Sequence, residues 1–377
     1  MKNIQMVDLQ GLHKRLEHKI KPAINDVLEK GQFINGPEVQ TFAINLAKFC
    51  GVSHVIPCAN GTDALQIALM ALDLQPGDEV IIPVHTYVAT AEVIALLRLT
   101  PVFVDVCAST FNIDVTKLQV CISEKTKVIV PVHLYGQCAD METILNIAKK
   151  NNLFVIEDTA QAIGAEYTFS NGTKKKAGTM GDIGCTSFFP SKNLGCMGDG
   201  GAIMTNSDVL ANKINMIANH GQSKKYQHDL VGCNSRLDTL QAAILKVKLL
   251  ELEDCNQRRK TAAAYYSQKL KKIEGIETPI ESSFSSHVYH QYTIKIANGW
   301  RDVIKNQLAD YGIPTMIYYP IPLHHQKAYS HHALGKYPVT ESLSNQVLSL
   351  PMHTEMNSEI QDYILNTLIK SINLVKR

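Results

Sequence analysis

Short apolar runs alternate with amphipathic segments through the first two thirds of the chain. The apolar runs lie at 54–58, 79–83, 102–105, 127–132 and 153–156, and helical patterns lie between most of them, as at 62–74 and 140–151. Continuous apolar runs separated by helices predict a mostly parallel sheet with helices on both faces. Ligands bind beyond the carboxyl ends of the strands in such sheets. Asp158 and the loop after Cys58 are both expected at such ends.

The last third of the chain has a different pattern. A long helical stretch at 237–270 has few helix breakers, and strands near 288–296 and 314–319 accompany helices near 301–311 and 358–375. A chain of 377 residues is long for one domain and suits two. We therefore expect a large three-layer α/β/α domain at 1–245 and a smaller α+β domain at 246–377.

A carboxylate and a lysine follow two of the apolar runs. Glu157 and Asp158 end the run at 153–156, and Lys192 precedes a glycine-rich loop at 195–201. Glycine lets the backbone approach a ligand closely, and a desolvated lysine loses its proton more easily and becomes nucleophilic. Pyridoxal phosphate needs this pair, because a lysine bonds its aldehyde and a carboxylate keeps its ring nitrogen protonated. Taken singly, Asp158 is equally explained as a helix cap and Lys192 as a surface lysine.

Three hydroxyl-bearing residues suggest further cofactor contacts. Gly61 and Thr62 stand where a strand turns into a helix, and the free N–H groups at a helix start suit a phosphate. Ser187 adds a hydroxyl close to Lys192, and Tyr87 follows a strand end, where its ring can stack on a flat heteroaromatic ring. The plain alternatives are a turn capped by Thr62 and a core or interface tyrosine.

Two histidine pairs lie in the last third of the chain, at 324–325 and 331–332. No acidic ligand pattern accompanies them, so we expect loop histidines and no metal site. Of the four, His324 is a candidate for a substrate pocket.

Charge and cysteine usage narrow the class of protein. A net charge of +2 gives no general attraction to nucleic acids or acidic membranes. Nine cysteines without a Cys-x-x-Cys pair indicate reduced thiols in a cytoplasm rather than disulfides or structural zinc. The chain start lacks the apolar core of a signal peptide, and no uncharged stretch is long enough to span a bilayer. We expect a cytoplasmic protein without nucleic-acid or membrane partners.

The motifs together resemble the sugar-nucleotide aminotransferases of the DegT/DnrJ/StrS family, which have the aspartate aminotransferase fold (fold type I). The similarity runs from Gly36 to His353. Its most specific parts are the segments at 59–65, 157–161, 186–192, 198–201 and 234–243. Such motifs rarely occur in this order by chance.

The resemblance implies a role for each matching residue. Lys192 would bond the cofactor and move the proton during transfer, Asp158 would pair with the pyridine nitrogen, and Gln161 would bind the ring hydroxyl. Gly61, Thr62 and Ser187 would hold the phosphate, and Tyr87 would stack on the ring. Asn234 would reach the phosphate of the neighbouring subunit, which implies a homodimer with two shared sites.

The arginine positions bear on the substrate. Aminotransferases for ordinary amino acids generally bind the α-carboxylate with an arginine of the C-terminal domain, a task that suits a bidentate guanidinium. After Arg301 no arginine follows until Arg377, so Arg236 is the best remaining carboxylate binder. This favours a keto sugar over a keto acid as the amino acceptor.

Within the family, the chain is most similar to enzymes that aminate the 3-keto position of a UDP-N-acetyl-hexuronic acid. Those enzymes carry His-Tyr-Pro where this chain has Tyr318, Tyr319 and Pro320, and the histidine belongs to their sugar pocket. We therefore take Tyr318 and Tyr319 as substrate-binding candidates and leave open a neutral 3-keto or 4-keto hexose on UDP or dTDP.

The resulting hypothesis is a pyridoxal-phosphate-dependent aminotransferase that moves an amino group from L-glutamate to a nucleotide-linked keto sugar, for lipopolysaccharide, O-antigen or other glycans. A sugar dehydratase on the same scaffold is the first alternative, but that branch has histidine in place of Lys192. A regulatory, DNA-binding protein is the second, and the near-neutral charge speaks against it.

Overall fold

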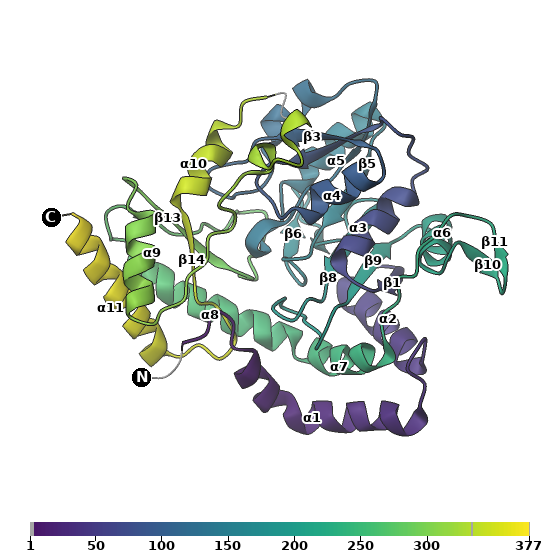
Figure 1. The fold of residues 1–377 in the computed structure, drawn as a ribbon, viewed down its shortest axis with the longest axis horizontal. Coiled ribbons are helices and arrows are strands. Elements are labelled where there is room, and N and C mark those ends of the chain that lie inside the picture. The colour runs from purple at the N-terminus through teal and green to yellow at the C-terminus, as the bar shows by residue number, and fades with distance from the viewer. Residues whose placement is uncertain (1–3, 333–334, 377) are drawn as a thin grey trace.

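The computed structural model describes residues 4–332 and 335–376. Figure 1 shows a large α/β body beside a smaller group of helices and strands that holds both chain ends. Eleven α-helices lie in the part of the chain described: α1 (Leu9–Lys30), α2 (Pro37–Cys50), α3 (Gly61–Met70), α4 (Ala89–Leu96), α5 (Met141–Asn151), α6 (Asp208–Ala218), α7 (Thr239–Leu250), α8 (Leu252–Leu270), α9 (Arg301–Asp310), α10 (Pro338–Gln346) and α11 (Ser358–Val375).

A seven-stranded sheet forms the centre of the large body. Its order is β1 (His54–Cys58), β9 (Gly201–Thr205), β8 (Ile183–Ser187), β5 (Phe154–Asp158), β4 (Thr126–Ile129), β2 (Glu79–Pro83) and β3 (Thr100–Val104). Strand β9 pairs antiparallel with both of its neighbours, and the other neighbouring pairs are parallel. The mostly parallel sheet is confirmed.

Helices cover both faces of this sheet, which explains its continuous apolar strands. Successive side chains of a strand point to opposite faces. In β2, Val80 and Ile82 enter the core beneath α3, α4 and α6, whereas Ile81 enters the core beneath α5. A third core, which includes Phe42 and Leu245, packs α2 and α7 on the sheet. The expected three-layer α/β/α architecture is confirmed.

A second, smaller sheet lies in the C-terminal part of the chain. It pairs β12 (Ile276–Glu277), β13 (Tyr292–Ile296) and β14 (Val347–Leu350) in antiparallel fashion. Its core joins α8, α9 and α11 through Tyr266, Ile304 and Leu368. The predicted boundary between residues 245 and 246 falls inside α7 and stays a prediction.

Two short hairpins complete the strands. They are β6 (Glu166–Thr168) with β7 (Lys174–Lys176), and β10 (Gln222–Lys224) with β11 (Gln227–His228). The second hairpin projects from the large body at the right of Figure 1. None of the helices within 4–332 and 335–376 has the length and apolar character needed to cross a bilayer.

Two predicted elements differ from the structure. The single helix at 237–270 is two helices, α7 and α8, which meet at Glu251. The prediction of a strand near 314–319 is wrong, because only Met316 of this segment forms a β-bridge, to Ser349. The peptide bond between Tyr318 and Tyr319 is cis. The Tyr135 hydroxyl donates to the Tyr318 carbonyl, so a side chain takes the place of a neighbouring strand there.

Candidate active site

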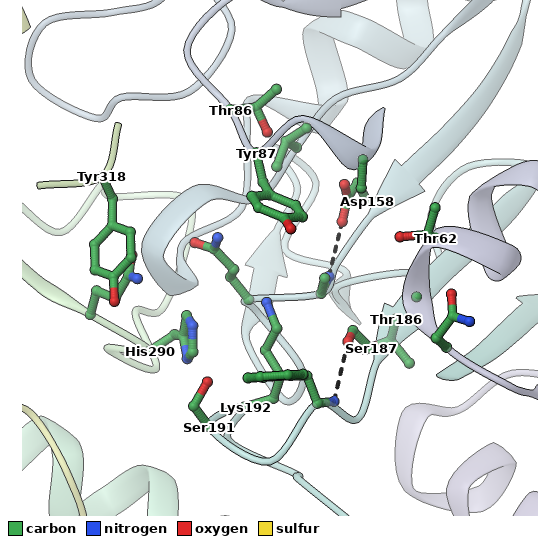
Figure 2. A pocket seen from close by; sticks show the side chains of 18 of the residues that line it. Thr62, Thr86, Tyr87, Asp158, Thr186, Ser187, Ser191, Lys192, His290 and Tyr318 are labelled. Atoms are coloured by element: carbon green, nitrogen blue, oxygen red, sulfur yellow. Dashed lines mark hydrogen bonds between the residues drawn. The ribbon is translucent and has the colours of Figure 1, made fainter. Parts of the chain in front are cut away.

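A cavity of about 960 Å³ opens at the carboxyl ends of the central strands. The turns after β1, β2, β5 and β8 all contribute to its wall. Nine of the residues selected from the sequence line it together: Gly61, Thr62, Tyr87, Asp158, Gln161, Ser187, Lys192, Tyr318 and Tyr319. Figure 2 shows the Lys192 side chain rising into the space between Asp158, Tyr87 and His290.

A tight turn after β8 presents Lys192 to the cavity. The Lys192 backbone N–H donates to the Phe189 carbonyl at 2.8 Å, which closes the turn. A Cβ atom at Gly195 would lie 2.4 Å from the Pro190 carbonyl oxygen, so the following chain can pass there only as glycine. Burial lowers the pKa of Lys192 to about 8, although the negative charge of Asp158 opposes this shift. The amine is therefore prepared to act as a nucleophile near neutral pH.

Asp158 and Glu157 point to opposite faces of β5, because side chains alternate along a strand. One Asp158 oxygen accepts from the Thr90 hydroxyl at 2.9 Å, and the other accepts from the Ala160 N–H at 3.1 Å. Figure 2 shows this carboxylate directed into the cavity. Glu157 is fully buried on the other face beside His133. Only Asp158 of the two acids can therefore meet a ligand.

The start of α3 and the end of β8 approach each other closely. A Cβ atom at Gly61 would lie 2.6 Å from the Ser187 Cβ, and one at Gly201 would lie 2.4 Å from the Asn60 carbonyl oxygen. Helix N-termini carry free N–H groups and a positive dipole end, and the hydroxyls of Thr62 and Ser187 lie beside them. This arrangement fits a phosphate group.

The cap of α3 differs from the expectation. Asn60, rather than Thr62, caps the helix, because the Asn60 side chain accepts from the Asp63 N–H at 2.8 Å. Thr62 lies in the first turn, and its hydroxyl is not needed for capping. It therefore remains available to a ligand.

Aromatic and amide groups line the opposite wall. The Tyr87 ring lies 6.1 Å from the Tyr319 ring, and Tyr87 is 57% exposed, so one wall offers an accessible aromatic surface. The side-chain oxygen of Gln161 accepts from the Tyr135 N–H at 2.7 Å, and the side-chain N–H of Gln161 donates to the Tyr319 hydroxyl at 3.2 Å. A side-chain amide has two N–H donors, which leaves one for a ligand.

Two residues that shape the site were not predicted from the sequence. Thr90 donates a hydrogen bond to Asp158. Its place in the short segment after β2, which also contains Tyr87, could have indicated this role. His290 lines the cavity, and its Nδ1 lies 3.3 Å from the Asn193 amide oxygen. Burial and the charge of Lys192 lower the pKa of His290 well below its usual range, so its ring is neutral. No local motif marked His290, because it reaches the site through the tertiary fold.

Three selected residues lie outside the cavity. His324 does not line the cavity: it is 5% exposed, packs on Tyr337 and contacts Glu341 at 3.1 Å. The reason is local, since the Leu323 N–H donates to the Val84 carbonyl and Leu323 packs in the same core as Val84 and Tyr337. Asn234 is exposed and Arg236 is half-buried on the segment after the β10–β11 hairpin. Arg377 lies outside the described residues.

Residues 14–369 match the DegT/DnrJ/EryC1/StrS aminotransferase family. The chain belongs to this family. It is a pyridoxal-phosphate-dependent aminotransferase with the fold expected from its motifs, so the predicted family, fold, enzyme class and cofactor are confirmed.

Three similar proteins illustrate the match. The UDP-2-acetamido-2-deoxy-3-oxo-D-glucuronate aminotransferase of Pseudomonas aeruginosa is 48% identical over 94% of this chain and 96% of its own. The dTDP-3-amino-3,6-dideoxy-alpha-D-galactopyranose transaminase of Aneurinibacillus thermoaerophilus is 45% identical over 94% and 96%. A crystal structure of ntda from Bacillus subtilis with bound cofactor PMP has a TM-score of 0.91 and 34% identity, and covers 99% of this chain and 86% of that one.

Proposed function

We propose that this aminotransferase moves an amino group from L-glutamate to the C3 keto group of a UDP- or dTDP-linked sugar. The observation that carries the proposal is a single cavity that joins Lys192, Asp158 and the anion cradle at the start of α3. Its volume of about 960 Å³ lies near the upper end of small-molecule sites, with room for a cofactor and a sugar. The names of the Pseudomonas and Aneurinibacillus relatives both refer to position 3 of a sugar.

The residues of the cavity have two tasks, which are to hold the cofactor and to move or retain protons. When bound, pyridoxal phosphate supplies an aldehyde that bonds amines and a ring that withdraws electrons from the adjacent carbon. Lys192 would bond the cofactor in the resting enzyme and would later carry a proton between the two carbons that flank the nitrogen, since burial lowers the pKa of its amine to about 8. Asp158 would keep a proton on the ring nitrogen.

The remaining contacts place the cofactor. The N–H groups at Gly61 and Thr62, with the hydroxyls of Thr62 and Ser187, would hold its phosphate. The free N–H of Gln161 would bind the ring hydroxyl, and Tyr87 would cover one face of the ring. Tyr318 and Tyr319 form the wall toward the sugar.

A homodimer completes the site. Among the described residues that line the cavity, Lys192 and His290 are the basic side chains, and His290 is neutral. Glutamate brings two carboxylates, which guanidinium groups bind well. We propose that Arg236 of the neighbouring subunit binds a carboxylate and that its Asn234 reaches the cofactor phosphate. The strongly exposed Tyr226 and Val231, near these residues in sequence, suit a covered interface.

The expected amino-sugar product and the residue at position 318 narrow the choice of sugar substrate. We propose an amino sugar made in the cytoplasm for lipopolysaccharide, O-antigen or another glycan, since all nine cysteines are free thiols. Tyr318 stands where the uronate enzymes that the chain resembles carry histidine, so both a uronate and a neutral 3-keto sugar belong in the substrate panel, with 4-keto sugars as the alternative.

Product mass tests the reaction. The cofactor-loaded protein is mixed with ¹⁵N-labelled L-glutamate and then with each keto sugar nucleotide. We expect glutamate to change the visible absorbance and the correct sugar to gain one labelled nitrogen. A Lys192→Ala variant should do neither. Loss of water without nitrogen gain, or no response to any amino donor, would contradict the proposal.

Complementation tests the shared site. Chains carrying Lys192→Ala and chains carrying Arg236→Ala are each expected to be inactive as homodimers. In a mixed dimer, one site combines an intact Lys192 with the partner's intact arginine, so random mixing should restore about a quarter of the wild-type activity. If Arg236 acted within its own chain, no site would be complete and no activity would return.

A further inference from the structure

Two histidines and a glutamate gather on the outer side of the C-terminal part of the chain. His324 and His325 belong to the short helix η4 (Leu323–His325), and Glu341 comes from the first turns of α10. One potential ligand atom from each lies within 4.8 Å of the others. We propose that these three side chains bind a divalent transition-metal ion such as Zn²⁺.

The spacing suits one ion. Two ligand atoms lie about 3.3 Å apart when each is about 2.0–2.1 Å from the same tetrahedral zinc ion. The Glu341 carboxylate oxygen lies 3.1 Å from His324 Nε2 and 4.0 Å from His325 Nε2, so these two distances must change by less than one ångström, and the ligand atoms of the two histidines lie within 4.8 Å of each other. Imidazole and carboxylate ligands are those that zinc, nickel and cobalt accept. A hydrogen bond accounts for the His324 contact but leaves the approach of His325 unexplained.

The two elements that carry the ligands are fixed to the large body. The Leu323 N–H donates to the Val84 carbonyl at 3.4 Å, next to the end of β2. The start of α10 is held by Asp105, which accepts from the Thr340 N–H at 2.9 Å and from its hydroxyl at 2.7 Å. Both anchors position the ligands before an ion arrives, so binding needs little reorganisation.

The exposure of the three side chains also suits a metal site with an open position. His324 is buried beneath the others, whereas the side chains of His325 and Glu341 are 56% and 47% exposed. An ion can therefore enter from solvent and keep water as its remaining ligand. In the metal-free chain His324 Nε2 carries the proton, because it faces the Glu341 carboxylate. This proton moves to Nδ1, which has no hydrogen-bond partner in the part of the chain described, when a metal ion takes its place. The Nε2 lone pair of His324 can then bind the metal.

Charge favours a cation at this place. Glu341 brings one carboxylate, and a second one, Asp105, holds the start of the same helix. An ion would join η4 to α10, and η4 follows the Tyr318–Tyr319 wall of the active site by only a few residues. Metal binding should therefore stabilise the folded protein against heat, independently of any substrate.

Calorimetric titration with ZnCl₂ tests the site. The cofactor-loaded full chain, freed of tags and treated with chelator, should bind about one ion per chain. His325→Ala and Glu341→Gln change exposed ends of side chains, and each should weaken binding about tenfold or more. His331→Ala is the matched control, since His331 is an exposed histidine on the neighbouring helix η5 (Ser330–His332), outside the cluster. It should leave the affinity unchanged.

Cobalt and heat provide two further readouts. Co²⁺ should give an intense visible absorbance of the tetrahedral type in the wild-type chain, lost in both variants. Zn²⁺ should raise the unfolding temperature of the wild type and of the His331→Ala control, and should leave both variants unaffected. Binding far below one ion per chain, or equal binding by wild type, His325→Ala and Glu341→Gln, would overturn the proposal.

Discussion

The side-chain amide of Gln161 donates to the hydroxyl of Tyr319 at 3.2 Å. This bond joins the loop after β5 to the C-terminal segment that closes the cavity, across 158 positions of sequence. Because the Tyr135 N–H holds the carbonyl oxygen of the same amide at 2.7 Å, the orientation of Gln161 is fixed with its N–H groups toward the cavity. The Tyr319 hydroxyl therefore positions the group proposed to bind the cofactor.

Removal of the Tyr319 hydroxyl should weaken cofactor binding modestly. Tyr319→Phe deletes one of the two bonds that orient Gln161, and a net hydrogen bond is worth about 0.5–1.5 kcal/mol. The dissociation constant of pyridoxal phosphate should rise by about 2- to 13-fold. Gln161→Ala removes the binding group itself and should have the larger effect. Titration of the apo protein, followed by visible absorbance, measures both.

Tyr318→Phe is the control for this pair, since the Tyr318 hydroxyl interacts with Gln291. It should leave the cofactor affinity unchanged. A loss in Tyr318→Phe as large as in Tyr319→Phe would show that Gln161 is not positioned through Tyr319.

Gly61→Ala should damage the phosphate cradle. The new Cβ would lie 2.6 Å from the Ser187 Cβ, so α3 and the end of β8 must move apart. We expect cofactor affinity to fall by about tenfold or more, because the backbone N–H groups no longer point to the same phosphate position. Gly198→Ala is a matched control on a neighbouring loop, since its Cβ would meet only the flexible Gln241 side chain, at 3.0 Å. Equal affinities of the two variants would argue against a phosphate at the start of α3.

The sequence predicted the large sheet well, for a physical reason. Strands such as β2 are buried on both faces, so they read as uninterrupted apolar runs, and α11 was found because its apolar residues recur at helical spacing. The segment at 314–319 has an apolar and aromatic composition typical of a strand. Its backbone instead meets the Tyr135 side chain, a contact that no local pattern encodes.

The site was predictable where short segments carry it. Asp158 ends β5 and Lys192 follows β8. The carboxyl ends of these neighbouring parallel strands lie at the same edge of the sheet, which brings the two side chains together. His290 and the pairing of Glu341 with His324 depend on how the C-terminal segments fold back onto the large body. His324 lies outside the cavity for the same reason, since it packs on Tyr337 although it is close in sequence to Tyr319.

Glu157→Gln should destabilise the fold more than it affects chemistry. The carboxylate is fully buried and accepts from the N–H groups of Gly178, Met180 and Gly181 at 2.9, 2.6 and 2.7 Å. His133 Nδ1 accepts from the Ala139 N–H, so its Nε2 carries the proton that binds Glu157. An amide cannot accept all four bonds, and we expect a loss of about 3–5 kcal/mol in unfolding free energy.

Urea denaturation of the cofactor-loaded protein measures this loss. Glu166→Gln serves as the control, because Glu166 is partly exposed and its partner Lys174 is largely exposed. An exposed ion pair is worth about 0–1 kcal/mol, so this variant should unfold near the wild-type midpoint. Similar midpoints for both variants would contradict the structural importance assigned to Glu157.

The pH dependence of cofactor attachment should report the environment of Lys192. Only the unprotonated amine attacks an aldehyde, and burial lowers the pKa of Lys192 to about 8. The attachment rate of the apo protein should therefore rise with pH and level off above about 8, rather than near the ordinary lysine value of about 10.4. Asp158 opposes the shift, so Asp158→Asn should move the midpoint to lower pH. Rapid mixing with pyridoxal phosphate measures the rate, and a midpoint near 10, or an upward shift in Asp158→Asn, would contradict a desolvated lysine beside that carboxylate.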